Sequence, residues 1–263
     1  MIYLHPDVHC DERLRRRSLD LVGGAAEGRI VLCVETEPGD ETGASLNGVD
    51  VPAGIGAVGV DARWGPETLA CSLHQMADLP VATARDAGRH GKACLVNLVR
   101  LAAACGVPYR GGRADVIGGI VSGLPPGFAG LRTRDANDAV IRAAQAAGGL
   151  PGSVALADVR AYCEEVAGED MRSAIPRRVT VERERAMADN LLLAESRNPG
   201  RDVHAVLGAG HLVPGLGEDR ARRLGLWTPE FAAYHSAIPR GSRLTEILAR
   251  SGRPFRIVDD HVA

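Results

Sequence analysis

Residues 203–215 read VHAVLGAGHLVPG, an apolar run that leads into a glycine turn with a histidine inside it. The apolar run predicts a β-strand, and the turn has two interpretations. A dinucleotide-binding loop needs the pattern GxGxxG, but Val213 stands at the third glycine position, and a histidine stands where close approach of a phosphate needs a small residue. The stretch is therefore interpreted as a strand end that presents His211 at the edge of a sheet.

Further apolar runs predict the rest of that sheet, at 1–4, 29–35, 55–62 and 254–260. The segments between them predict helices at 11–23, 66–78, 90–105, 134–147, 153–167, 175–200 and 243–252. Strands are thus expected near both ends of the chain and helices in its middle. This pattern predicts a single α/β domain over 1–263, with a central, mainly parallel sheet flanked by helices and a helical insertion at 66–175.

The composition excludes several classes of function. A net charge of -2 gives no reason to expect nucleic acid or an acidic membrane surface as a partner. No apolar stretch reaches the roughly 18 residues that span a bilayer, and the N-terminus lacks the pattern of a signal peptide. The six cysteines form no CxxC pair, which indicates reduced thiols. We expect a cytoplasmic protein that acts on a small molecule or peptide, and its oligomeric state is left open.

Several residues that can carry chemistry follow the ends of separate predicted strands. In parallel sheets ligands bind beyond the carboxyl ends of the strands, so we expect these residues to lie near one another. They are His5, Asp7, His9, Glu35, Glu37, Asp61 and His211.

The first group lies in HPDVHCDE, residues 5–12. A purely structural interpretation is available, because Pro6 ends the strand and Asp7 caps the first helix. It leaves His9 unexplained. In VETE, residues 34–37, the two glutamates have strand spacing and point to one side if the strand continues. A carboxylate at the end of a buried strand is costly unless it is paired or binds a metal, and Glu35 is favoured because it adjoins the apolar run.

The segment ERERAMADN, residues 182–190, is predicted to be helical. Helical spacing places Arg183, Met187 and Asn190 near one face, and Arg185 with Asp189 on another. Two interpretations stay open. Either one arginine serves the site, or the segment is a surface helix with ion pairs between residues four apart.

Taken together, these motifs resemble the superfamily that joins erythromycin-esterase-like, ChaN-like and Tiki/TraB proteins. The similarity rests on the early strand-end histidine, the strand that ends in Glu, the late ER…MA.N helix, the GAGHL turn and the ending GSRLTEILARSGRPFRIV. It covers roughly 1–65 and 176–260. The family pattern Gly-x-x-His is intact at Gly208 to His211, whereas its first copy reads Pro6-Asp-Val-His9, with Asp7 where the esterase branch has Glu.

The resemblance implies a sheet-edge site for hydrolysis. In its Tiki-like form, His9, Glu35 and His211 would bind a divalent ion (Mn, Co, Zn or Fe) that activates water. In its esterase-like form, His9 would act as a metal-free general base, oriented by Glu35 or Asp7. Arg183 or Arg185 would then stabilise an oxyanion or hold a substrate carboxylate.

We therefore expect a hydrolase-like enzyme acting on an ester or amide bond, a chemistry that also adapts to cyclisation or elimination in specialised metabolism. The second hypothesis is a ChaN-type protein that binds haem or another cofactor without turnover. A third is an interaction module whose site has decayed.

Overall fold

The computed structural model describes residues 1–7, 12–39, 45–46, 49–51, 54–78, 164–223 and 229–258. The chain forms two compact units. One comprises Met1–Arg63 with Thr180–Ala263, and the other comprises Trp64–Val179. Of the helices predicted in the middle of the chain, those at 90–105 and 134–147 and most of 153–167 lie outside the described residues.

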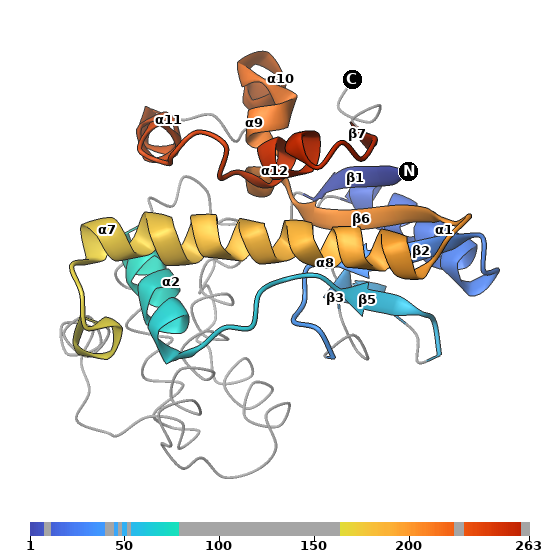
Figure 1. Ribbon diagram of the computed structural model, residues 1–263, viewed down its shortest axis with the longest axis horizontal. Helices are drawn as coiled ribbons and strands as arrows, with labels where there is room; N and C mark the ends of the chain where they lie inside the picture. Colours follow the sequence, from blue (N-terminus) through green and yellow to red (C-terminus); the bar gives the residue numbers. More distant parts are fainter. Residues whose placement is uncertain are drawn as a thin grey trace, which may run out of the picture. The chain divides into compact units, whose positions relative to one another are not determined.

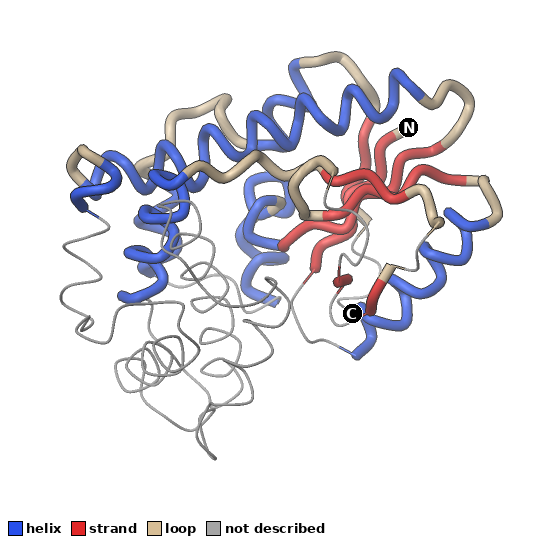
Figure 2. The backbone as a smooth tube through the Cα atoms, turned by 90° about the horizontal axis from the view of Figure 1, so that it is seen from below, coloured by secondary structure: helices blue, strands red, loops and turns tan. Residues whose placement is uncertain are grey.

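The first unit contains a five-stranded sheet in the order β5-β2-β6-β1-β7, and every pairing in it is parallel. The strands are β1 (Ile2–Asp7), β2 (Ile30–Val34), β5 (Ala57–Gly59), β6 (Asp202–Gly208) and β7 (Phe255–Ile257). Figure 2 shows these strands gathered between helices. The predicted α/β class with a parallel sheet is confirmed, and all five carboxyl ends therefore meet at one edge.

The other elements of this unit are helices and a small ladder. The helices are α1 (Glu12–Ala26), α8 (Arg183–Arg197), the 3-10 turn η3 (Ala209–His211), α9 (Val213–Leu216), α10 (Glu218–Arg223), α11 (Pro229–Ser236) and α12 (Leu244–Arg250). The short strands β3 (Ser45–Leu46) and β4 (Val49–Asp50) pair antiparallel. Figure 1 shows α8 running alongside β6. None of the helices described here combines the length and apolar character needed to traverse a bilayer.

The second unit contains α2 (Pro66–Asp78) and α7 (Met171–Ile175), which contact each other. The π-helix η2 (Pro176–Glu182) follows α7 and leads in sequence to α8. Helix α2 has the predicted bounds, with Pro66 at its first position, where the missing N–H costs no helical hydrogen bond.

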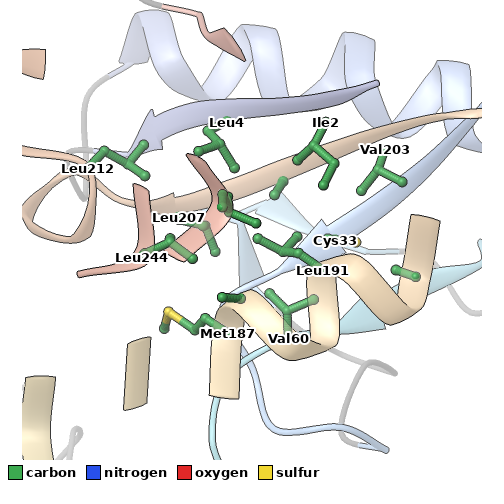
Figure 3. Close-up of a cluster of buried hydrophobic side chains, with 14 of the residues drawn as sticks. Ile2, Leu4, Cys33, Val60, Met187, Leu191, Val203, Leu207, Leu212 and Leu244 are labelled. Atoms are coloured by element: carbon green, nitrogen blue, oxygen red, sulfur yellow. The ribbon is translucent and has the colours of Figure 1, made fainter. Parts of the chain in front are cut away.

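Strand alternation divides the core into two layers. On one face, residues of α8 and α12 pack against odd-numbered residues of β2 and β6, and Figure 3 shows Met187 and Leu191 of α8 beside this face. On the other face, α1 packs against even-numbered residues of β2 and β6, among them Leu32 and Val34. Leu191 is fully buried, as expected for a helix residue that faces a sheet directly. The polar residues of α8 that lie on this same face are thereby directed at the sheet and its edge.

Several elements differ from the sequence prediction, and three of them have a bearing on the sheet and its edge. Strand β1 passes through Pro6 to Asp7, because the β7 ladder ends at Leu4 and no ladder bond to β7 is lost at the proline. Helix α1 continues past the predicted end at residue 23 to Ala26, and the left-handed residue after it is Gly28, with φ 72°. The segment 38–54, for which neither a strand nor a helix was predicted, contains β3 and β4.

Gly59 in β5 has no room for a side chain. An added Cβ would stand 2.4 Å from the carbonyl oxygen of Glu37, which is backbone and cannot move aside by a rotamer change. We expect Gly59→Ala to lower the free energy of unfolding by about 1–3 kcal/mol, the usual cost of overpacking. Urea unfolding measures the loss. Gly56→Ala is the matched control, since nothing lies within 4 Å of its added Cβ, and equal losses in both variants would contradict the steric explanation.

Candidate functional site

Four charged or titratable side chains meet at the carboxyl edge of the sheet. Glu35 comes directly after β2, Asp61 follows β5, and His211 ends the η3 turn after β6. Arg183, the first residue of α8, lies among them. We call these four residues the edge cluster. Three of them were predicted from the rule that strand ends gather ligands, and Arg183 was one of two candidate arginines.

Arg183 contacts the other three members. Its Nε donates to Asp61 Oδ1 at 2.7 Å and its Nη2 donates to Asp61 Oδ2 at 2.8 Å, a two-point arginine–carboxylate pair. Nη2 also donates to Glu35 Oε1 at 2.5 Å, and Nη1 lies 3.0 Å from His211 Nε2. The guanidinium thus links residues that follow three different strands or turns.

His211 lies between two carboxylates. Its Nδ1 is 3.0 Å from Glu184 Oε1, and its Nε2 is 3.4 Å from Glu35 Oε1. The second oxygen of Glu35 accepts a hydrogen bond from the backbone N–H of Gly208. A Cβ at Gly208 would stand 3.0 Å from that oxygen, so the glycine lets the carboxylate approach the backbone closely.

Glu184 is fully buried, and each of its two oxygens contacts two described groups. Oε1 faces His211 and accepts from Arg243 Nη2 at 2.8 Å. Oε2 accepts from Arg243 Nε at 2.8 Å and from the Leu244 backbone N–H at 2.7 Å. Arg243 Nη2 also donates to the carbonyl oxygen of Gly210 at 3.0 Å. Arg243 therefore supports His211 twice, through Glu184 and through the backbone just before the histidine.

Beyond this pair lies His235 of α11, whose Nδ1 accepts a hydrogen bond from Arg243 Nη1. Burial and the charge of Arg243 lower the pKa of His235 to about 4, so its ring is neutral near pH 7. The hydrogen bond agrees with this, because Nδ1 of His235 can accept it only when the ring is neutral.

Exposure identifies the part of the site that a substrate can reach. The Glu184 side chain is inaccessible, and the arginine that pairs with it is 5% exposed. The side chains of Glu35 and His211 are 19% and 14% exposed. The side chain of Arg183 is 13% exposed. The accessible surface of the site is thus made by Glu35, His211 and Arg183, with the Arg243–Glu184 pair behind them.

The electrostatics favour two ionised carboxylates. Burial by itself raises the pKa of Glu35, but the charge of Arg183, the nearby His211 and the Gly208 hydrogen bond outweigh it and hold the pKa well below its usual range. Burial likewise raises the pKa of Glu184, and the contacts with His211 and Arg243 outweigh it, so this pKa also lies below its ordinary value.

His211 is drawn toward its protonated form. Burial and Arg183 lower its pKa, but Glu35 and Glu184 outweigh them and raise the pKa to about 9. If Nε2 of His211 carries no proton, it accepts a hydrogen bond from Arg183. If it carries a proton, it donates to Glu35, so the two contacts favour different protonation states of the ring. Charge balance favours the proton: the carboxylates of Glu35, Glu184 and Asp61 outnumber the two guanidiniums, and an imidazolium neutralises the difference.

The raised pKa makes stability depend on pH. Because the folded pKa of His211 exceeds the unfolded one, its contribution is fully present below about pH 6.5 and is lost as pH rises through about 9. Between about pH 7 and about pH 10 we expect a loss of about 2 kcal/mol from this group. Urea unfolding at both pH values measures it. His211→Gln should lose correspondingly less over that interval, and an equal loss in both proteins would show that His211 does not cause it.

Other predicted site residues lie elsewhere. Arg185 is exposed with Asp189 on another face of α8, because two residues turn a helix by about 200°. Glu37 is not part of the edge cluster: β2 ends at Val34, so the alternation that would place Glu37 beside Glu35 does not continue. His9 lies outside the described residues.

His5 and Asp7 belong to the opposite face of the sheet from Glu35. The Nε2 atom of His5 is 3.0 Å from His204 Nδ1, and the Tyr3 ring stacks on His204 at 4.7 Å. Strand alternation places Asp7 on the same face as Tyr3 and His5, which is the α1 side. The structure therefore does not place these two residues on the same face of the sheet as Glu35.

Glu184, Arg243 and His235 were not singled out in the sequence. Glu184 stands beside Arg183 in the quoted ERER segment, and Arg243 begins the quoted RLTEILARSG helix. Helical spacing was the available signal, because it places Glu184 on the same buried face of α8 as Met187, Ala188 and Leu191. A glutamate on such a face requires partners.

Glu35 and His211, as the structure places them, do not fit the metal that the resemblance implies, and His211 does not fit a haem ligand. Glu35 and His211 both contact the Arg183 guanidinium, which repels a second cation. Within the described ranges no group of three or more His, Cys, Asp or Glu side chains has the arrangement of a metal site. A haem ligand needs an imidazole nitrogen directed at open space, and both nitrogens of His211 contact charged side chains.

Comparison with protein-family models, with curated proteins and with solved structures gave no match to this chain. The residues and their geometry therefore carry the functional argument.

Proposed function

We propose that the protein is a hydrolase-like enzyme that cleaves an ester or amide bond of a small molecule or peptide. The proposal rests above all on the position of His211, whose two ring nitrogens face the carboxylates of Glu184 and Glu35 at the carboxyl edge of the sheet. An imidazole flanked in this way has a fixed orientation and a stabilised positive charge, and it remains partly accessible. These are the properties of a group that protonates a leaving atom or holds a developing oxyanion.

The roles then divide as follows. His211 donates to the carbonyl oxygen as negative charge develops there, and its proton passes to the leaving alcohol or amine. Glu35 orients the attacking water, and His9, which lies outside the described residues, is proposed as the base that takes the water's proton. Water adds its oxygen to the acyl carbon, and the bond to the leaving group breaks.

Arg183 has a positioning role in this scheme. Its N–H groups donate to Asp61 and Glu35, so it fixes Glu35 instead of holding the substrate. Asp61 in turn holds the guanidinium at two points, and Asn190 donates to the Val60 carbonyl just before it at 3.1 Å. The position of the Arg183 guanidinium among these carboxylates favours the metal-free, esterase-like form of the chemistry over a metal-bound one.

The test is turnover of a panel of p-nitrophenyl esters and p-nitroanilides in water enriched in ¹⁸O. We expect release of the chromophore together with one solvent oxygen in the carboxylate product. Chromophore release without solvent oxygen would point to cyclisation or elimination and would contradict hydrolysis. Turnover unchanged in His211→Ala would contradict the assigned site.

A further inference from the structure

Three groups that commonly bind divalent metals converge on the guanidinium of Arg183. Glu35 Oε1 and Asp61 Oδ2 lie 2.5 Å and 2.8 Å from Nη2, and His211 Nε2 lies 3.0 Å from Nη1. Two carboxylates and one imidazole are a ligand set that first-row transition metals accept. In this chain the centre of that set is a side-chain cation.

We propose that Arg183 is a resident cation that keeps the edge cluster free of divalent metal, and that Glu35, Asp61 and His211 bind such a metal once the guanidinium is removed. The inference concerns occupancy of the site and does not require turnover.

Distances within the cluster support the proposal. Glu35 Oε1 and His211 Nε2 are 3.4 Å apart. Two ligands held at about 2.1 Å by one tetrahedral ion are separated by about 3.4 Å, so this pair already has the spacing of shared metal ligands. Asp61 is held by the same Arg183 nitrogen that holds Glu35, so both carboxylates border the position that the guanidinium occupies.

The nature of arginine makes the exclusion permanent. A guanidinium does not lose its proton in proteins, so no change of pH vacates the position. The Asp61 pair at two points and the contact with Glu35 hold it there. A metal ion would have to displace a cation that makes several hydrogen bonds in order to reach the ligands.

The experiment measures Co²⁺ binding by calorimetry, by visible absorption and by elemental analysis after dialysis. We expect the unaltered protein and Arg185→Ala, whose arginine is exposed two residues away, to retain no Co²⁺. Arg183→Ala should bind one Co²⁺ per chain, and adding Co²⁺ should raise its Tm by several degrees. The Arg183→Ala, His211→Ala double variant should bind none.

Two results would overturn the proposal. One is stoichiometric Co²⁺ in the unaltered protein that His211→Ala removes. The other is a folded Arg183 variant, verified by circular dichroism, that binds no Co²⁺. Arg183→Met, which keeps the volume of the stem without the charge, serves if the alanine variant does not fold. Loss of hydrolysis alone decides nothing here, so failure of the proposed function and failure of this inference remain distinguishable.

Discussion

The Arg243→Ala variant is expected to lose about 3–5 kcal/mol of unfolding free energy, the usual cost of leaving one member of a buried ion pair without its partner. The reason is Glu184, which is inaccessible to solvent and keeps its charge through Arg243, His211 and the Leu244 N–H. Removing the guanidinium takes away two of those hydrogen bonds and also the bond to the Gly210 carbonyl. Urea unfolding at neutral pH measures the loss.

Arg253→Ala is the matched control for this prediction. Arg253 is exposed, and its Nε lies 3.6 Å from Glu195 Oε2. Surface pairs of this kind contribute about 0–1 kcal/mol, so the control should change stability little. A loss below about 1 kcal/mol in Arg243→Ala would show that Glu184 does not depend on this arginine for its charge.

The second large effect concerns turnover. Once a chromogenic substrate has been found, His211→Ala is expected to lower kcat by about 10²–10⁴-fold, the range that general acid–base groups contribute. The loss should lie mainly in kcat, because His211 acts most strongly when charge develops on the substrate. Steady-state kinetics of the purified variant measure it.

Arg185→Ala is the control for turnover, since this arginine lies on an exposed part of α8 and outside the edge cluster. Its kinetic constants should match those of the unaltered protein. If His211→Ala, shown to be folded by circular dichroism, kept its kcat and changed only KM, His211 would be a binding group, and the proposed acid role would be wrong.

Much of the site follows from sequence because its members stand next to strands. Glu35 adjoins a run apolar on both faces, and Asp61 and His211 follow two other strands. In a parallel sheet these positions meet at one edge whatever the strand order. Proximity at the edge was therefore predictable, even though the order β5-β2-β6-β1-β7 was not.

The face of the sheet on which each of these side chains lies was not predictable in the same way. Leu4, Ala205 and Cys33 stand in one row of the sheet, so Pro6, two residues past Leu4, is level with the position of Glu35. Asp7 is consequently out of phase with Glu35, and its side chain takes the other face. This outcome depends on the register between β1, β6 and β2, which the sequence of a single strand does not contain.

The role of Arg243 could not be predicted from the sequence, for a different reason. Its importance comes from the packing of α12 against α8, two helices joined only through tertiary contacts. The segment RLTEILARSG predicts the helix and its glycine stop, but the partner of its first arginine is set by the fold. Glu184 is an intermediate case, since its position on the buried face of α8 was readable once the helical phase was known.

The most direct test is the protonation state of His211, measured by ¹H–¹⁵N NMR of the imidazole nitrogens and assigned by comparison with His211→Gln. We expect protons on both ring nitrogens at neutral pH, with Nδ1 directed at Glu184 and Nε2 at Glu35, and a titration near pH 9. A neutral ring with one bare nitrogen at neutral pH, titrating at or below the ordinary histidine value, would contradict the charged imidazolium on which the proposed acid role depends.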